Sequence, residues 1–160
     1  MEGLRGLGLL VILTAAAITD YRTYEIPDRL HVAGIGWWLL FLFLEPELWR
    51  TAVLRGVLGG ALISGGLLLL SHVMDYILGR ESLGGGDIKL FFVTGLYLGA
   101  AGNLLNLMIS SVLGIVVCLA ERNGDEESKA IPFAPAIAVS TGICLLVGER
   151  LISWYLSLFW

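Results

Sequence analysis

The stretch Gly84-Gly85-Gly86-Asp87-Ile88-Lys89-Leu90 leads a glycine-rich turn directly into an apolar run over residues 88–101. Glycine has no Cβ atom, so these three residues allow positive φ angles and the close approach of another backbone. Asp87 stands at the entry of the apolar run, where an ionisable group is costly and usually marks a functional site. The glycines alone would fit a surface loop equally well. The acidic Asp87 and the basic Lys89 directly after them favour a functional turn.

The chain around this stretch is too apolar for a soluble domain of its size. Of its 160 residues, 57% are hydrophobic and 15% are charged, and the mean hydropathy is +0.84. A lipid bilayer must therefore serve as the solvent for much of this surface. The net charge of −4 and the scattered basic residues argue against nucleic acid as a partner. Cys118 and Cys144 lie in apolar runs without CxxC or Cys–His spacing, so we expect no metal site.

Apolar runs separated by polar breaks predict one all-α membrane domain over residues 1–160. The runs predict about six transmembrane helices, over residues 4–19, 31–44, 52–72, 88–101, 104–120 and 133–148. The second and fourth runs are shorter than the roughly 20 residues of a full crossing, so they need flanking turns or a thinned bilayer. The first run also resembles a cleavable signal peptide. We favour a retained helix, because Arg5 beside Glu2 makes a weak basic leader and cleavage would discard the helix that leads to Asp20.

The order of the runs places both conspicuous acids on one side of the membrane. In a six-helix protein the first, third and fifth connections share a side, and here they carry Asp20, Asp87 and the turn at 131–135. The opposite side receives the loop near 45–55 and a short turn at 101–103. Lys and Arg residues are more numerous in the acid-bearing connections, which predicts that this side faces the cytoplasm. The tail at 151–160 either lengthens the last helix or lies at the interface on its aromatic residues.

Two carboxyl groups that meet at such a place can hydrolyse a peptide bond. They share one proton and hold one water, which one group deprotonates while the other protonates the substrate carbonyl oxygen. Asp20 ends the first apolar run and Asp87 begins the fourth, so the helix dipoles favour the proton on Asp20 and the charge on Asp87. Lys89 serves either as an interfacial anchor or as an electrostatic partner of Asp87. Asp28, which follows Pro27, has the pattern of a helix start.

These elements together resemble the type IV prepilin peptidases, membrane aspartyl proteases of the GxGD kind. An aspartate that closes helix one before an Ile-Pro turn appears as Asp20 to Asp28, the GxGDxKL element as Gly84 to Leu90, and the late Ile-Pro-Phe-x-Pro element as Ile131 to Pro135. The resemblance implies a catalytic pair, Asp20 and Asp87. Supporting roles fall to the matching motif residues Gly84, Gly85, Gly86, Lys89, Pro27, Pro132 and Pro135.

The same resemblance implies the substrate and the location. The substrates are pilin-like precursors with a short basic leader before a long hydrophobic helix, cut at the cytoplasmic face of the cell membrane. Larger bacterial members carry a segment with paired CxxC motifs, associated with metal and with methylation of the new amino terminus. This sequence has neither, so methyl transfer, S-adenosylmethionine, zinc and any other cofactor are not expected. Ala134 replaces the usual glycine of the late motif.

Three other functions fit parts of the pattern. A small ion- or proton-coupled transporter could use Asp20 and Asp87 as ligands, although transporters place such acids near the bilayer midplane and often show inverted repeats. An intramembrane protease of the presenilin type shares GxGD, but it pairs this motif with Tyr-Asp and Pro-Ala-Leu elements that are absent here. A non-catalytic scaffold for filament assembly is also compatible with the sequence.

Overall fold

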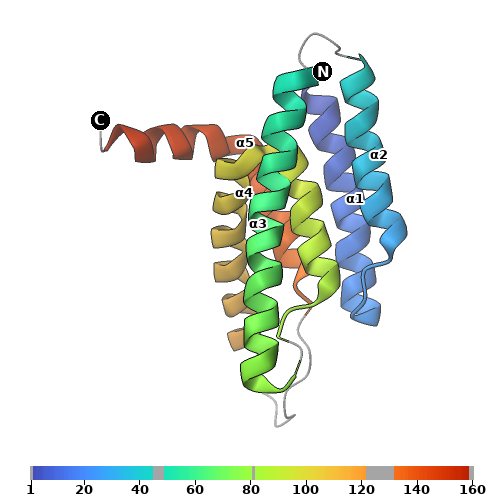
Figure 1. The fold of residues 1–160 in the computed structure, drawn as a ribbon, viewed down its shortest axis with the longest axis vertical. Helices are drawn as coiled ribbons and strands as arrows, with labels where there is room; N and C mark the ends of the chain where they lie inside the picture. Colours follow the sequence, from blue (N-terminus) through green and yellow to red (C-terminus); the bar gives the residue numbers. More distant parts are fainter. Residues whose placement is uncertain (1, 45–48, 81, 122–131, 159–160) are drawn as a thin grey trace.

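The described residues of the computed structural model, 2–44, 49–80, 82–121 and 132–158, form helices joined by turns, without a β-strand among them. The helices are α1 (Glu2–Thr23), α2 (Asp28–Leu44), α3 (Trp49–Leu78), α4 (Gly85–Glu121) and α5 (Ala134–Ser157). Figure 1 shows most of their length aligned side by side in one bundle. The all-α prediction is confirmed.

Helix α4 consists of two antiparallel arms rather than one straight rod. Its helical geometry breaks at Gly99, which has φ 69° and ψ −178°, a conformation that favours glycine. Beyond this point, Asn103 Nδ2 donates to the Phe91 carbonyl at 2.9 Å. In a straight helix these two residues would be separated by roughly 18 Å along the axis. The chain therefore turns back at Gly99, and Figure 1 shows one arm on each side of α3.

The two arms correspond to the predicted helices at 88–101 and 104–120, but the predicted turn at 101–103 was wrong. That prediction placed Asn103 in the turn. Instead, Asn103 is fully buried in the second arm. Its amide also donates to the Gly59 carbonyl at 3.2 Å, and its oxygen accepts from the Thr94 hydroxyl at 2.8 Å. Neighbouring helices can satisfy a polar side chain inside an apolar bundle, so polarity alone did not locate the turn.

Several of these helices have the length and composition of membrane spans. Among the described residues, four helices are long and apolar enough to cross a bilayer: α1, α3, α4 and α5. Helix α2 has 17 residues, which agrees with the short apolar run seen in the sequence. The chain is thus a multi-pass membrane protein, whereas the number of about six crossings stays a prediction.

The distribution of side chains is that of a protein surrounded by lipid. Large apolar side chains lie on the outside, as with Leu146, which is 82% exposed, and Leu69, which is 69% exposed. Small residues lie where helices meet: a Cβ atom added to Gly95 would lie 2.4 Å from Gly60 Cα. Helices α3 and α4 therefore approach at backbone distance, as membrane helices commonly do.

A buried apolar cluster connects the end of α1 with the beginnings of α4 and α5. Its fully or almost fully buried members are Leu9, Leu13, Ala16, Leu90, Phe91, Val93, Ala134 and Ile137. Asp20 follows Ala16 by one helical turn, and Asp87 precedes Leu90 by three residues. The cluster therefore fixes the segments that carry both acids.

The last turns of α5 leave the bundle. Figure 1 shows the red end of this helix projecting sideways, away from the other helices. Trp154 is 62% exposed on this segment. The arrangement agrees with the interfacial alternative for the tail, because Trp and Tyr are enriched where lipid meets water.

Candidate active site

Asp20 lies in the last turn of α1 but is bound to the beginning of α5. Its side chain is only 6% exposed, and its Oδ2 atom accepts a hydrogen bond from the Ala134 backbone N–H at 2.9 Å. Ala134 is the first residue of α5, where backbone N–H groups have no partner within the helix. Asp20 therefore satisfies a donor at a helix amino terminus, although it belongs to the carboxyl end of its own helix.

The turn after Asp20 brings α2 towards the glycine-rich segment. Tyr24 adopts a positive φ of 55°, and its N–H donates to the Asp20 carbonyl at 2.8 Å, which ends α1 with a left-handed residue. Ile26 then lies against the glycines: a Cβ atom on Gly86 would be 3.2 Å from Ile26 Cβ. Glycine at position 86 therefore permits this close approach.

Asp87 lies in the first turn of α4, at the end of the bundle where α1 ends. The N–H groups of Asp87 and Ile88 donate to the Gly84 carbonyl at 3.1 and 3.3 Å, which closes the turn. The carboxyl groups of Asp87 and Asp20 are near enough to interact electrostatically. Asp87 Oδ1 is buried and has no hydrogen-bond partner among the described residues. A buried oxygen of this kind calls for an explanation, such as a bound water or a catalytic role.

The three glycines of the motif differ in their surroundings. A Cβ atom on Gly84 would lie 3.2 Å from Asp87 Oδ2, whereas one on Gly85 would meet nothing within 4 Å. Position 84 is therefore tight beside the carboxyl group and position 85 is open. The closed turn and the tight contacts at 84 and 86 show that this segment packs against Asp87 and Ile26 and is not a detached surface loop.

Lys89 binds Asp28, whereas the sequence suggested either an interfacial anchor or an electrostatic partner of Asp87. Its Nζ atom donates to Asp28 Oδ1 at 2.7 Å, and both side chains are more than half exposed. This contact holds the pKa of the Asp28 carboxyl group below its ordinary value. Asp28 begins α2 as predicted, and Pro27 just before it is exposed.

The late proline motif positions the start of α5. Pro135 lies in the first turn of this helix, and Phe133 is its N-cap residue. Proline is suited to a first helical turn because no N–H is needed there. Pro132 and Pro135 thus flank the Ala134 N–H that holds Asp20, while Ile131 lies outside the described residues.

The sequence interpretation did not assign a role to His31. This residue is 5% exposed, and its Nε2 atom lies 3.0 Å from the Gly86 carbonyl oxygen. The available signal was a histidine at the first position of an apolar run, but its partner lies 55 residues away.

A cluster of buried polar side chains, deeper in the bundle, was also missed. Its members are Thr94, Asn103, Asn106, Ser110, Ser140 and Thr141. Asn106 accepts hydrogen bonds from the Ser140 and Thr141 hydroxyls, so the cluster joins the second arm of α4 to α5. The spacing of the two asparagines, three residues apart in an apolar run, was the signal that could have found it.

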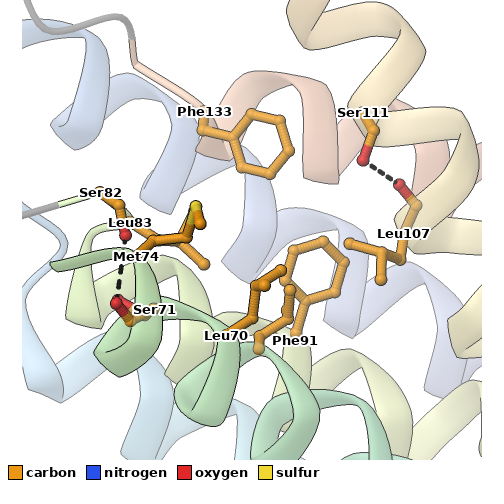
Figure 2. A pocket seen from close by; sticks show the side chains of 10 residues that line it. Leu70, Ser71, Met74, Ser82, Leu83, Phe91, Leu107, Ser111 and Phe133 are labelled. Carbon is orange, nitrogen blue, oxygen red and sulfur yellow. Dashed lines mark hydrogen bonds between the residues drawn. The ribbon is translucent and has the colours of Figure 1, made fainter. Parts of the chain in front are cut away.

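An apolar pocket of about 240 Å³ is lined in part by residues that adjoin, in sequence, the segments involved with the two acids. Figure 2 shows Phe91 and Phe133 among the side chains that face it, with Leu83 and Met74 on another wall. Leu83 precedes the Gly84 carbonyl that closes the Asp87 turn, and Phe133 precedes Ala134. The volume is below the roughly 300–1,000 Å³ of pockets that enclose whole small molecules. It has room for a single large apolar side chain.

The described residues thus assemble two carboxyl groups, a glycine turn and an apolar pocket at one end of the bundle. Within the described ranges, no three His, Cys, Asp or Glu side chains gather as metal ligands would. Two interacting carboxyl groups can activate a water and protonate a carbonyl oxygen. The arrangement therefore has the elements required for peptide hydrolysis.

Comparisons with known proteins point to one family. Residues 7–119, which include both acids, match the family model described as the type IV leader peptidase family. The chain is 31% identical over 156 residues to the prepilin leader peptidase/N-methyltransferase of Aeromonas salmonicida strain A449, covering 96% of this chain and 53% of that protein. It is 31% identical over 157 residues to the protein of the same name from Bacillus subtilis strain 168, covering 95% of this chain and 58% of the relative. The chain therefore spans about half the length of these curated relatives. No solved structure matches it.

Proposed function

Because this chain belongs to the type IV leader peptidase family, we propose that it is a membrane aspartyl endopeptidase that removes the leader peptide from prepilin-like precursors. The observation that supports the proposal is the placement of Asp20 and Asp87, 67 positions apart in sequence, in the last turn of α1 and the first turn of α4 at one end of the bundle. The two groups hold one water between them, and the water attacks the carbonyl carbon of the scissile peptide bond as one carboxylate takes its proton.

The hydrogen bonds favour a division of roles opposite to the one inferred from the helix dipoles. Asp20 accepts the Ala134 N–H at the amino end of α5, an interaction that stabilises a carboxylate. Asp87 Oδ1 is buried without a donor among the described residues, which suits a protonated group. Asp20 is therefore the base that deprotonates the water, and Asp87 donates its proton to the substrate carbonyl oxygen. The proton is shared, so the assignment describes the preferred state of the pair.

The surroundings of the pair support a substrate with an apolar segment. The glycine turn leaves Gly85 open on the surface, so an extended substrate backbone can lie against it. The neighbouring pocket receives a large apolar side chain of the substrate near the cleaved bond. A prepilin-like precursor supplies such residues at the start of its hydrophobic helix. The excess of basic residues in the acid-bearing connections supports a site that faces the cytoplasm.

A transporter that uses the two acids as ligands has less support. Both acids lie in terminal helical turns, Asp20 at the end of α1 and Asp87 at the beginning of α4. A coupled transporter would more naturally carry them near the bilayer midplane. The family match also favours the peptidase.

The proposal is tested with purified full-length protein in lipid and a synthetic prepilin substrate. Asp20→Asn and Asp87→Asn should each lower the cleavage rate by about 10²- to 10⁴-fold, the contribution expected of a general acid or base. Glu25→Gln is the matched control, because Glu25 is an exposed acid near the same end of the bundle and should cleave normally. Cleavage that persists in either asparagine variant would remove the pair from the mechanism. Proton flux into liposomes without cleavage by the wild type would favour the transporter.

A further inference from the structure

Two residues in the first turn of α2 bind the first turn of α4, one on each side of Asp87 in the sequence. On one side, His31 Nε2 lies 3.0 Å from the Gly86 carbonyl oxygen. On the other side, Asp28 binds Lys89 at 2.7 Å. The two contacts differ in burial, since His31 is almost fully buried and the Asp28–Lys89 pair is exposed. The buried contact is the one that can impose a fixed geometry.

The hydrogen bond of His31 acts on the peptide unit that carries Asp87. A carbonyl oxygen only accepts hydrogen bonds, so His31 Nε2 carries the hydrogen and donates it. The Gly86 carbonyl and the Asp87 N–H belong to one planar peptide group. The N–H end of this group donates to the Gly84 carbonyl at 3.1 Å, and His31 binds the other end. Both ends of the plane are therefore held.

The hydrogen bond from His31 matters because the residue before Asp87 is a glycine. A glycine has more accessible backbone conformations than other residues, so the plane after it is poorly determined by local sterics. The Asp87 carboxyl group is not held through Oδ1, because this atom has no hydrogen-bond partner among the described residues. Without the bond from His31, the direction of the Asp87 side chain would depend on the Gly86 backbone and the turn hydrogen bonds alone.

We propose that His31 is a positioning residue for Asp87: its Nε2–H bond to the Gly86 carbonyl fixes the peptide plane before Asp87 and so directs that carboxyl group towards Asp20. The inference rests on the proposed peptidase function for its consequence, but the geometric role can be tested without it. His31 acts through the backbone and does not contact the substrate.

Two substitutions separate the positioning role from simple filling of space. In His31→Gln, the side-chain amide nitrogen occupies a place similar to Nε2 and keeps a donor for the Gly86 carbonyl. In His31→Asn, the amide nitrogen corresponds to Nδ1 and cannot reach that oxygen. His31→Ala is a second variant without the donor. Thermal unfolding of each purified full-length variant shows which of them retain the fold.

In folded protein, His31→Asn and His31→Ala should lower kcat by about 10- to 100-fold, as expected when a catalytic group is displaced by about 1 Å. The KM for the prepilin substrate should change little, and His31→Gln should restore most of the lost kcat. A purely structural histidine would instead give losses that follow the unfolding temperature, with no advantage for glutamine over asparagine. That result, or normal kcat in folded His31→Asn, would overturn the proposal.

Hydrogen exchange at the Asp87 and Ile88 amides supplies the measurement that does not depend on cleavage. Exchange should be faster in His31→Asn than in the wild type and close to the wild-type rate in His31→Gln. Equal exchange in all three proteins would refute the positioning role even if the peptidase is active. Conversely, the expected exchange pattern in a wild type that cleaves nothing would support the positioning role and reject the proposed function.

Discussion

Gly59→Ala tests the tightest contact between α3 and the reversal of α4. A Cβ atom at this position would lie 2.4 Å from the Gly99 carbonyl carbon and 2.6 Å from both Gly99 Cα and Ala100 N. All three are backbone atoms of the turn, so no side chain can rotate away. Ordinary contact distances begin at 3.4 Å, and the close-packed interior therefore has to open by about 1 Å.

The cost follows from two opposing effects. Overpacking of this kind destabilises a protein by about 1–3 kcal/mol, and backbone neighbours place Gly59→Ala near the upper end. Alanine recovers roughly 0.5–1 kcal/mol as a better helix former, which leaves a net loss of about 2 kcal/mol. For a chain of this size, each kcal/mol lost from the free energy of unfolding lowers the thermal unfolding midpoint by about 2–4 °C. The midpoint of Gly59→Ala should therefore fall by about 4–8 °C.

Gly66→Ala is the matched control in the same helix. A Cβ atom there would meet nothing within 4 Å, so only the propensity gain remains and the midpoint should rise slightly. Thermal unfolding of both variants and of the wild type is measured in the same detergent and monitored by far-UV circular dichroism. A Gly59→Ala protein as stable as the wild type would refute the close approach of α3 to the turn. An equal loss in Gly66→Ala would show that the effect does not come from this contact.

Three further variants test other contacts. Asn106→Leu removes the acceptor of two hydroxyl groups and should lower the free energy of unfolding by about 1–2 kcal/mol, measured by thermal unfolding. Ser111→Trp fills the apolar pocket and should raise the KM for a prepilin substrate. The control is Val112→Trp, because Val112 is exposed on the same arm and does not line the pocket, so its KM should stay at the wild-type value. Equal KM values in the two variants would contradict a substrate pocket. Lys89→Gln should return the pKa of Asp28 to its ordinary value. The Asp28–Lys89 pair stabilises the fold above the ordinary aspartate pKa, and this stabilisation is lost as the pH falls through the lowered pKa of Asp28. When the thermal unfolding midpoint is measured at decreasing pH, it should therefore drop less in Lys89→Gln than in the wild type.

Local features of the sequence were sufficient for the class of protein and for the placement of the two acids at helix ends. Apolar runs report directly on transfer to lipid, and they predicted a helical membrane protein with both arms of α4 recognisable as separate segments. The order of the runs predicted that Asp20 and Asp87 belong to one end, and in the structure the end of α1 and the beginning of α4 lie at the same end of the bundle. These inferences succeed because hydropathy and chain order do not depend on how helices pack.

Other features depended on which helices touch. The reversal at Gly99 instead of 101–103 reflects hydrogen bonds that bury Asn103 between helices. The partner of His31 is a carbonyl in another helix, and nothing near His31 in the sequence reveals it.

The sequence by itself determined that two carboxyl groups stand at helix ends in a lipid-embedded chain, because that follows from residue type and position along apolar runs. Only the tertiary structure decided which of them receives a backbone donor. Asp20 ends its own helix, yet it meets the amino end of α5, 114 residues away. A hydrogen bond acts over about 3 Å, so the charge preference of each acid depends on its neighbours in space and not on its neighbours in the chain.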